Sequence, residues 1–169
     1  LQRTLKFKAG LDTPLEDCER IIANLKAGYP QLSTRQDVVK RQAKVRRYSE
    51  TWLERRRYLP GIASEDWGKK SFAERCAMNT PIQGTAADIL KLALGRLIVE
   101  LPDYPWLRPL LQIHDELVFE LPVDKVEEAA ALIRSCMEAQ PFPEFDVPIV
   151  AEAAFGPSFG ELAEMEVAR

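Results

Sequence analysis

Three consecutive polar residues, His114, Asp115 and Glu116, interrupt a run of strand-forming residues. Leu110–Ile113 precede them and Leu117–Phe119 follow, so we expect the polar triplet at the turn of a β-hairpin. Such a turn exposes two neighbouring carboxylates at the end of a rigid sheet. Mg²⁺ takes one or two protein carboxylates and fills the rest of its shell with water or phosphate oxygens. The triplet therefore predicts a place for a hard cation, although aspartate is also common in turns for conformational reasons alone.

Two details bear on the chemistry of this turn. It contains no Gly, Asn or Pro, so turn propensity alone did not select its residues. His114 is the single histidine of the chain and has no cysteine partners, which excludes a His/Cys zinc site. The sequence also lacks a Gly-rich phosphate loop, a G-x-S-x-G elbow and a second histidine for an acyl-transfer triad. Hydrolase chemistry of these kinds has no support.

A second polar group lies on an expected helix. Arg75, Asn79 and Gln83 are spaced four residues apart, so on an unbroken α-helix they form one stripe. Toward the C-terminus the same stripe becomes apolar, with Ala86, Leu90, Ala93 and Leu97. This change predicts that the first half of the helix faces a polar ligand and the second half is buried. A solvated helix start is the alternative that the sequence leaves open.

Basic residues are concentrated between residues 35 and 57, with aromatic residues among them. They are Arg35, Lys40, Arg41, Lys44, Arg46, Arg47, Arg55, Arg56 and Arg57, with Tyr48, Trp52 and Tyr58 interleaved and Lys69, Lys70 and Arg75 following. A phosphate backbone is the natural partner of such a surface, because lysine and arginine displace its counterions and arginine binds phosphate with two hydrogen bonds. The block favours nucleic-acid binding over a merely solubilising face.

The charge is divided unevenly along the chain. Residues 1–114 carry 20 lysines and arginines against 13 aspartates and glutamates, a balance of +7. Residues 115–169 carry 3 against 13, a balance of −10, and the whole chain is therefore only −3. This division predicts two surfaces with different tasks, of which the basic one faces nucleic acid.

Composition indicates a folded globular chain. Of its 169 residues 46% are hydrophobic and 29% charged, which is enough to build a core. No apolar run approaches the ~20 residues of a membrane helix, so no membrane partner is expected. Cys18, Cys76 and Cys136 are far apart and match no metal spacing, so we expect reduced core thiols in an intracellular protein. The chain begins with Leu and no signal segment follows, which predicts a piece of a longer protein.

Hydrophobic spacing and breaker residues predict the secondary structure. We expect helices over 14–27, 32–47, 72–101 and 124–140, a loop over 64–70, hairpins within 46–62 and 110–122, and a last strand over 149–153. The longest helix contains Pro81, which should kink it or bend its first turns. Asp124 is the expected N-cap of the last helix. Hairpins outnumber βαβ units, so the predicted fold class is α+β, an antiparallel sheet covered on one side by helices.

Several segments, taken in order, resemble the C-terminal polymerase region of the family A DNA polymerases, the bacterial DNA polymerase I type. They are GYP (28–30), ETWLERRRYLP (50–60), AER (73–75), NTPIQGTAADILKLAL (79–94), LLQIHDELVFE (110–120) and VPIVAEAAFG (147–156). The resemblance covers residues 11–162. It implies an incomplete fragment of a palm-type polymerase domain. Residues 1–62 would be the basic helical segment and hairpin after the fingers helix, and residues 63–169 the C-terminal palm part with motif C.

The resemblance also implies roles for individual residues. Asp115 would be a Mg²⁺ ligand, Glu116 its supporting carboxylate and His114 a contact to the primer end. The expected DNA contacts elsewhere are Arg75, Asn79 and Gln83 in the minor groove, the basic pair Lys69 and Lys70 near the backbone, and the paired arginines Arg55 and Arg56. The implied partners are primer–template DNA and deoxynucleoside triphosphates. The implied setting is DNA replication and repair in the bacterial cytoplasm, or a phage-encoded protein in a bacterial host.

The sequence departs from the family pattern in two places. Glu54 stands where the family usually has Gly, so the turn there is expected to differ or be looser. The motif A aspartate and the nucleotide-binding fingers helix lie upstream and are not among these 169 residues. The implied mechanism is two-metal phosphoryl transfer, and Asp115 supplies half of the aspartate pair. We therefore expect the fragment alone to be inactive.

Two other functions stay open at this point. A non-catalytic nucleic-acid-binding module built on the same palm half would carry the same basic block. A single-subunit RNA polymerase would use a carboxylate turn in the same way. The match around QGTAAD (83–88) favours a DNA polymerase over it.

Overall fold

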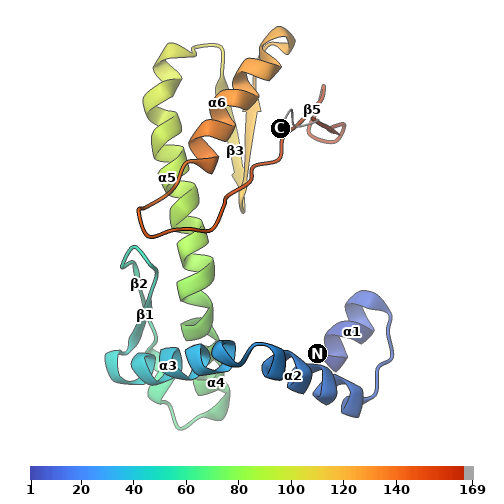
Figure 1. Ribbon diagram of the computed structural model, residues 1–169, viewed down its shortest axis with the longest axis vertical. Helices are drawn as coiled ribbons and strands as arrows, with labels where there is room; N and C mark the ends of the chain where they lie inside the picture. Colours follow the sequence, from blue (N-terminus) through green and yellow to red (C-terminus); the bar gives the residue numbers. More distant parts are fainter. Residues whose placement is uncertain (166–169) are drawn as a thin grey trace. The chain divides into compact units, whose positions relative to one another are not determined.

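The computed structural model describes residues 1–165 of the chain (Figure 1). Its backbone contacts form two compact units, Leu1–Ile82 and Gln83–Arg169. The boundary predicted between residues 1–62 and 63–169 stays a prediction.

The first unit is mainly helical. Its helices are α1 (Gln2–Ala9), α2 (Leu15–Gly28), α3 (Pro30–Arg46) and α4 (Trp67–Asn79). The helices predicted over 14–27 and 32–47 are confirmed as α2 and α3. Two carboxylates in the first turn of α2 favour its start, and Pro30 opens α3 at a position where no backbone N–H is needed. Helix α1 was not predicted, and none of its residues is buried.

A two-stranded hairpin follows α3, as the sequence predicted. Strand β1 (Tyr48–Glu50) pairs antiparallel with β2 (Arg56–Tyr58), and Glu50 is the Cα partner of Arg56. The short 3₁₀ helix η1 (Pro60–Ala63) comes next. At the root of the hairpin the Leu59 N–H donates to the carbonyl of Arg47 over 2.8 Å, so the first backbone bond lies beside the end of α3.

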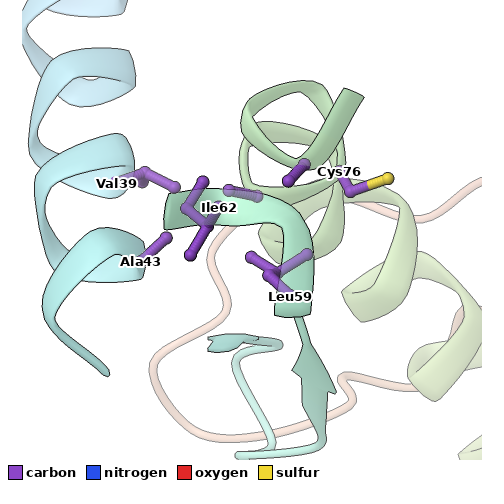
Figure 2. Close-up of a cluster of buried hydrophobic side chains, with 7 residues drawn as sticks. Val39, Ala43, Leu59, Ile62 and Cys76 are labelled. Atoms are coloured by element: carbon purple, nitrogen blue, oxygen red, sulfur yellow. The ribbon is translucent and has the colours of Figure 1, made fainter. Parts of the chain in front are cut away.

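The core of this unit is formed by residues of α3, η1 and α4 together with Leu59, which follows β2. Its buried residues are Val39, Ala43, Leu59, Ile62, Ala73, Cys76 and Ala77. Figure 2 shows Val39 and Ala43 of α3 on one side of Ile62 and Leu59, with Cys76 of α4 on the other. Ile62 has no exposed surface. The buried Ser49 hydroxyl also donates to the Ala77 carbonyl over 2.9 Å, which ties β1 to α4.

The loop predicted over 64–70 is wrong from residue 67 onward. Helix α4 begins at Trp67, and the Asp66 carboxylate caps it by accepting the Lys69 N–H over 2.9 Å. A side-chain oxygen at the N-cap satisfies a backbone N–H that the helix cannot pair internally. Gly68 hides this start, because glycine weakens the helical signal of the first turn.

The expected helix over 72–101 is divided in three. Helix α4 ends at Asn79, Thr80–Gly84 form a π-helical turn, η2, and α5 runs over Thr85–Glu100. The π-helical turn contains Pro81, which cannot donate the backbone bond that a regular helix requires. The predicted kink or bend stays a prediction. The division between the two compact units falls within this turn.

The second unit combines two helices with antiparallel pairs. After α5 come η3 (Leu101–Asp103), β3 (Arg108–Ile113), β4 (Glu116–Glu120), η4 (Val123–Lys125) and α6 (Val126–Glu138). Helices α5 and α6 pack against each other (Figure 1). The predicted hairpin within 110–122 is confirmed, with a register shift between Pro109 and Leu111. The α+β fold class is therefore confirmed, with small antiparallel sheets.

Two predictions in this unit are wrong. Helix α6 begins at Val126 without a side-chain cap, and Asp124 lies in η4 instead of capping it. Residues 149–153 form no strand; β5 (Ala154–Phe155) pairs instead with β6 (Ala163–Glu164). The segment before β5 is bound to α6 through side chains. The Ala151 N–H donates to Glu138 over 2.8 Å, and Arg134 donates to the Ala151 carbonyl over 3.2 Å.

Arg96 of α5 caps the C-terminal end of α6 by hydrogen bonds to backbone carbonyls. Its guanidinium donates to the carbonyls of Cys136 and Ala139, both over 3.1 Å, and to that of Gln140 over 2.9 Å. The last carbonyls of a helix have no partner within it, and a cation there also suits the helix dipole. Arg96 thus joins α5 to the end of α6.

Two further sequence predictions can be compared with the structure. Cys18, Cys76 and Cys136 are buried and free, as expected. Within residues 1–165, no helix is both long and apolar enough to cross a membrane.

Candidate functional site

The β3–β4 hairpin turns at His114 and Asp115. Ile113 and Glu116 are the last paired residues, so Glu116 begins β4 and the turn itself has two central residues. His114 has a φ of 56°, in the left-handed region, and Asp115 does not. A positive φ at a central residue is a feature of the tight two-residue turns that join antiparallel strands. The Gln112 amide donates to the His114 carbonyl over 3.4 Å.

All three residues of the predicted triplet are exposed at this tip. The prediction that Asp115 stands exposed at the end of a hairpin is confirmed. The turn needs no glycine because histidine tolerates the left-handed region better than most residues. The result is a carboxylate on a short, fixed turn.

The donor set at this tip fits part of a Mg²⁺ site. Asp115 and Glu116 offer exposed carboxylate oxygens, and Mg²⁺ needs only one or two of these together with water and substrate phosphate oxygens. Among residues 1–165, no group of three or more His, Cys, Asp and Glu side chains is gathered to hold a metal ion.

The polar helical residues do not form one regular stripe. Arg75 and Asn79 are exposed one turn apart on α4, and the Arg75 guanidinium donates to the Ser71 hydroxyl over 2.8 Å. Gln83 is also exposed but lies in the π turn, which contains more residues per turn than an α-helix. The spacing of four thus does not place Gln83 directly above Asn79. Farther on, the buried residues of the predicted stripe are Leu90, Ala93 and Leu97, while Ala86 is exposed.

The β1–β2 hairpin carries the paired arginines. Arg55 ends the turn, and Arg56 begins β2, with both side chains exposed. The Arg56 guanidinium lies 4.7 Å from the centre of the Tyr48 ring, and its Nε is 3.7 Å from Glu50 Oε2. An arginine over an aromatic face is attracted by the ring's negative face. Arg56 is thus held on the hairpin, with its cation still accessible.

The turn of this hairpin has the geometry expected for glycine. The Thr51 N–H donates to the Arg55 carbonyl, and the Glu54 N–H donates to the Thr51 carbonyl, over 3.0 and 3.1 Å. Glu54 has a φ of 61°. A three-residue loop with a left-handed third residue is a common hairpin connection, and glycine is the preferred residue there. The chain therefore keeps a glycine-type turn with a glutamate in it.

Lys69 and Lys70 lie in the first turn of α4 and are exposed. The helix N-terminus carries a partial positive charge, so cations in the first turn are disfavoured by a few tenths of a kcal/mol to about 1 kcal/mol. Local helix stability thus does not account for this pair.

Sequence reasoning missed the role of Glu50, which belongs with the basic hairpin. Glu50 contacts two arginines, with Oε1 2.9 Å from Arg46 Nη1 and Oε2 facing Arg56. The first pair joins the last residue of α3 to the last residue of β1, so the helical spacing rule does not predict it. The second pair depends on the strand register, which the sequence does not display.

Comparisons with known proteins give the chain its family. The sequence model of DNA polymerase family A matches residues 2–161. DNA polymerase I of Geobacillus stearothermophilus is 39% identical over 150 residues, which cover 88% of this chain and 17% of that protein. The thermostable DNA polymerase I of Thermus filiformis is 38% identical over 157 residues, which cover 90% of this chain and 18% of that protein.

A solved structure agrees with this match. It is the POL domain of Pol1 from M. smegmatis in complex with DNA primer–template and dNTP, with a TM-score of 0.73 and 35% identity. The match covers 83% of this chain and 24% of that one. The chain therefore spans less than a fifth of the two curated relatives and about a quarter of the solved one. It belongs to DNA polymerase family A.

Proposed function

We propose that this chain is part of a DNA-directed DNA polymerase that adds nucleotides to a primer end. The observation that carries the proposal is Asp115, exposed on the two-residue turn of β3–β4 within the residues matched to DNA polymerase family A. A rigid hairpin holds a carboxylate in one place, and positioning is most of what a protein contributes to phosphoryl transfer.

The carboxylates of the tip would hold Mg²⁺, with Asp115 as the ligand and Glu116 as its support. When bound, the metal supplies charge stabilisation of the transferred phosphoryl group and activation of the attacking hydroxyl. Asp115 would set where that charge lies, because its backbone belongs to a two-residue turn between paired strands. His114, beside it on the same turn, would contact the primer end.

The exposed cations and amides would bind the primer–template. Lys69, Lys70, Arg55 and Arg56 suit phosphate contacts, since lysine and arginine bind the backbone without reading its sequence. Arg75, Asn79 and Gln83 offer hydrogen bonds that suit base edges or sugars in the minor groove. The net charge of +7 over residues 1–114 supports this assignment.

The chain alone is proposed to be inactive. Two-metal transfer needs ligands that bridge both ions, and the tip offers one adjacent pair of carboxylates. The missing aspartate, the fingers helix and the binding of deoxynucleoside triphosphates would come from the rest of a longer protein. In that arrangement residues 1–62 form the segment after the fingers and residues 63–169 the palm part. The proposed setting is DNA replication and repair in the bacterial cytoplasm.

The test is primer extension by a full-length polymerase that contains this chain, with and without Asp115→Asn. We expect extension that needs Mg²⁺ and is lost in the variant. Extension that is equal in both proteins would show that Asp115 is not part of the metal site.

The alternative is a non-catalytic nucleic-acid-binding module. Its support is the block of basic residues between residues 35 and 57, which suits nucleic-acid binding with or without catalysis. The two functions separate in the same experiment, because a binding module retains primer–template DNA yet never extends it in the full-length protein.

A further inference from the structure

Glu50 lies between two arginines that come from different elements. Its Oε1 is 2.9 Å from Nη1 of Arg46, in the last turn of α3, and its Oε2 is 3.7 Å from Nε of Arg56, the first residue of β2. Each carboxylate oxygen thus faces a different guanidinium group. One acidic side chain joins the end of α3 to both strands of the hairpin.

Arg56 is held from a second side by an aromatic ring. Its guanidinium carbon is 4.7 Å from the centre of the Tyr48 ring, and that ring packs edge-on against Tyr58 with centres 6.1 Å apart. The strand register pairs Tyr48 with Tyr58 and Glu50 with Arg56. The ring and the carboxylate together restrict where the Arg56 cation can point.

The support beneath these contacts is buried. Ser49, between the two contact residues of β1, is 7% exposed and bonded to the Ala77 carbonyl of α4. Leu59, directly after β2, belongs to the core shown in Figure 2. These contacts anchor the base of the hairpin. The backbone that carries Glu50 is therefore held in place beside the two guanidinium groups.

The ion pairs with Glu50 leave out both terminal nitrogens of Arg56 and one terminal nitrogen of Arg46. A guanidinium group has five N–H donors, and its two terminal nitrogens form the fork that binds phosphate. Glu50 faces Nε of Arg56 and a single terminal nitrogen of Arg46. The side chains of Arg46 and Arg56 are 47% and 54% exposed, against 31% for Glu50. Ion pairs this exposed contribute little to stability.

We propose that Glu50 is a positioning residue for nucleic-acid binding, which orients Arg46 and Arg56 as a pair of guanidinium groups for backbone phosphodiesters. The inference rests on the proposed function of this hairpin. It adds Arg46 to the phosphate-binding residues and gives an acidic side chain a favourable role in binding a polyanion.

Glu54 provides a matched control on the same hairpin. Glu50→Gln and Glu54→Gln each remove one negative charge, and only the first removes the carboxylate that faces the two arginines. Simple charge arithmetic predicts that both variants bind DNA more tightly. Positioning predicts opposite signs for the two.

The experiment measures binding of the 169-residue chain to primer–template DNA at several salt concentrations. For Glu54→Gln we expect binding tighter by about 1.4- to 5-fold at low salt, the range of exposed charge interactions. For Glu50→Gln we expect weaker binding and a salt slope lower by about 0.9 for each phosphate that is no longer bound. Glu50→Asp keeps the carboxylate and should give a slope between those of the wild type and Glu50→Gln.

The outcomes separate the inference from the function beneath it. If Arg46→Ala and Arg56→Ala bind like the wild type with unchanged slopes, the proposed binding function of the hairpin fails. If those two weaken binding while Glu50→Gln strengthens it as Glu54→Gln does, the positioning role alone is overturned. Circular dichroism checks folding of each variant. Should Glu50→Gln unfold, a wild-type slope for folded Glu50→Asp overturns the proposal.

Arg46 and Arg56 could also bind the phosphates of a free deoxynucleoside triphosphate instead of the DNA backbone. The dNTP affinity of each variant is therefore measured without DNA. A change in dNTP affinity with no change in the DNA salt slope would overturn the assignment to phosphodiesters.

Discussion

Ile113 and Glu116 face each other as the last paired residues of the β3–β4 hairpin. Only two residues remain to reverse the chain, and one of them carries the proposed metal-binding carboxylate. The position of Asp115 thus follows directly from a strand register, which is a more rigid constraint than a loop would impose.

The first prediction concerns that carboxylate. In a full-length polymerase containing this chain, Asp115→Asn should slow primer extension by about 100-fold or more, because a bound metal contributes several kcal/mol of transition-state stabilisation. Glu120→Gln, an exposed change at the far end of β4, is the control and should leave the rate within a factor of about two, as exposed charges contribute little. Equal reductions of the rate in both variants would contradict the assignment.

The second prediction concerns the isolated chain. We expect no primer extension by residues 1–169 at any Mg²⁺ concentration, because one adjacent pair of carboxylates does not replace the ligands of a two-metal site. A gel-based extension assay measures this. Robust incorporation that Asp115→Ala abolishes would show that the site is complete within this chain.

The third prediction concerns Lys70, whose removal should weaken DNA binding and at the same time stabilise the fold. Lys70→Ala should lower the slope of log affinity against log salt by up to about one unit, since one bound phosphate contributes about 0.9. The same change should raise the stability of the chain by about 0.3–1 kcal/mol, because it removes a cation from the first turn of α4. DNA titrations at several salt concentrations and urea unfolding measure the two effects.

Gln83→Ala is the counterpart of that variant. It removes a neutral hydrogen-bonding group, so we expect DNA binding to weaken by about 1 kcal/mol with little change in slope. Identical slopes for the Lys70 and Gln83 variants would contradict the division into backbone and minor-groove contacts.

The fourth prediction concerns the glutamate in the glycine-type turn. Glu54→Gly should stabilise the chain by about 0.5–1 kcal/mol, because a left-handed conformation costs about 1–2 kcal/mol for residues other than glycine and glycine loses more chain entropy on folding. The midpoint of urea unfolding measures it. Glu65→Gly, at an exposed residue without a positive φ, should bring no gain; a gain there of the same size would show that the backbone conformation is not the cause.

The fifth prediction concerns the closure of α6. Arg96→Ala should destabilise the chain by about 1–3 kcal/mol, the range for hydrogen bonds that involve a charged group, since three carbonyls lose their donor. Lys91→Ala, an exposed change on the same helix, should stay within about 0.5 kcal/mol. Thermal unfolding followed by circular dichroism compares them, and similar destabilisation by both would rule out a specific role for Arg96.

Local signals in the sequence were enough for several elements. Helices α2 and α3 and the two main hairpins have their own spacing and breaker residues, and the tip at Asp115 follows from the strands around it. Helix α1 has no buried residue, so no apolar periodicity marked it. Gly68 weakened the start of α4, where the cap at Asp66 decides the outcome.

Other features depend on partners distant in the sequence. Residues 149–153 have the composition of a strand, yet strand propensity measures how well a residue fits a sheet and does not supply the sheet. In the structure, the backbone of Ala151 forms hydrogen bonds with the side chains of Arg134 and Glu138 instead of with a strand. The group around Glu50 was missed for a related reason, since it requires the register of β1 and β2.

The three buried thiols give each compact unit its own reporter of opening. Cys18 and Cys76 lie in the first unit and Cys136 in the second, and none is in a disulfide. A thiol reagent reaches a buried cysteine only when the surrounding structure opens, so its labelling rate measures the free energy of that local opening. Mass spectrometry of the labelled peptides would therefore show whether the two units unfold together or one before the other, without any introduced probe.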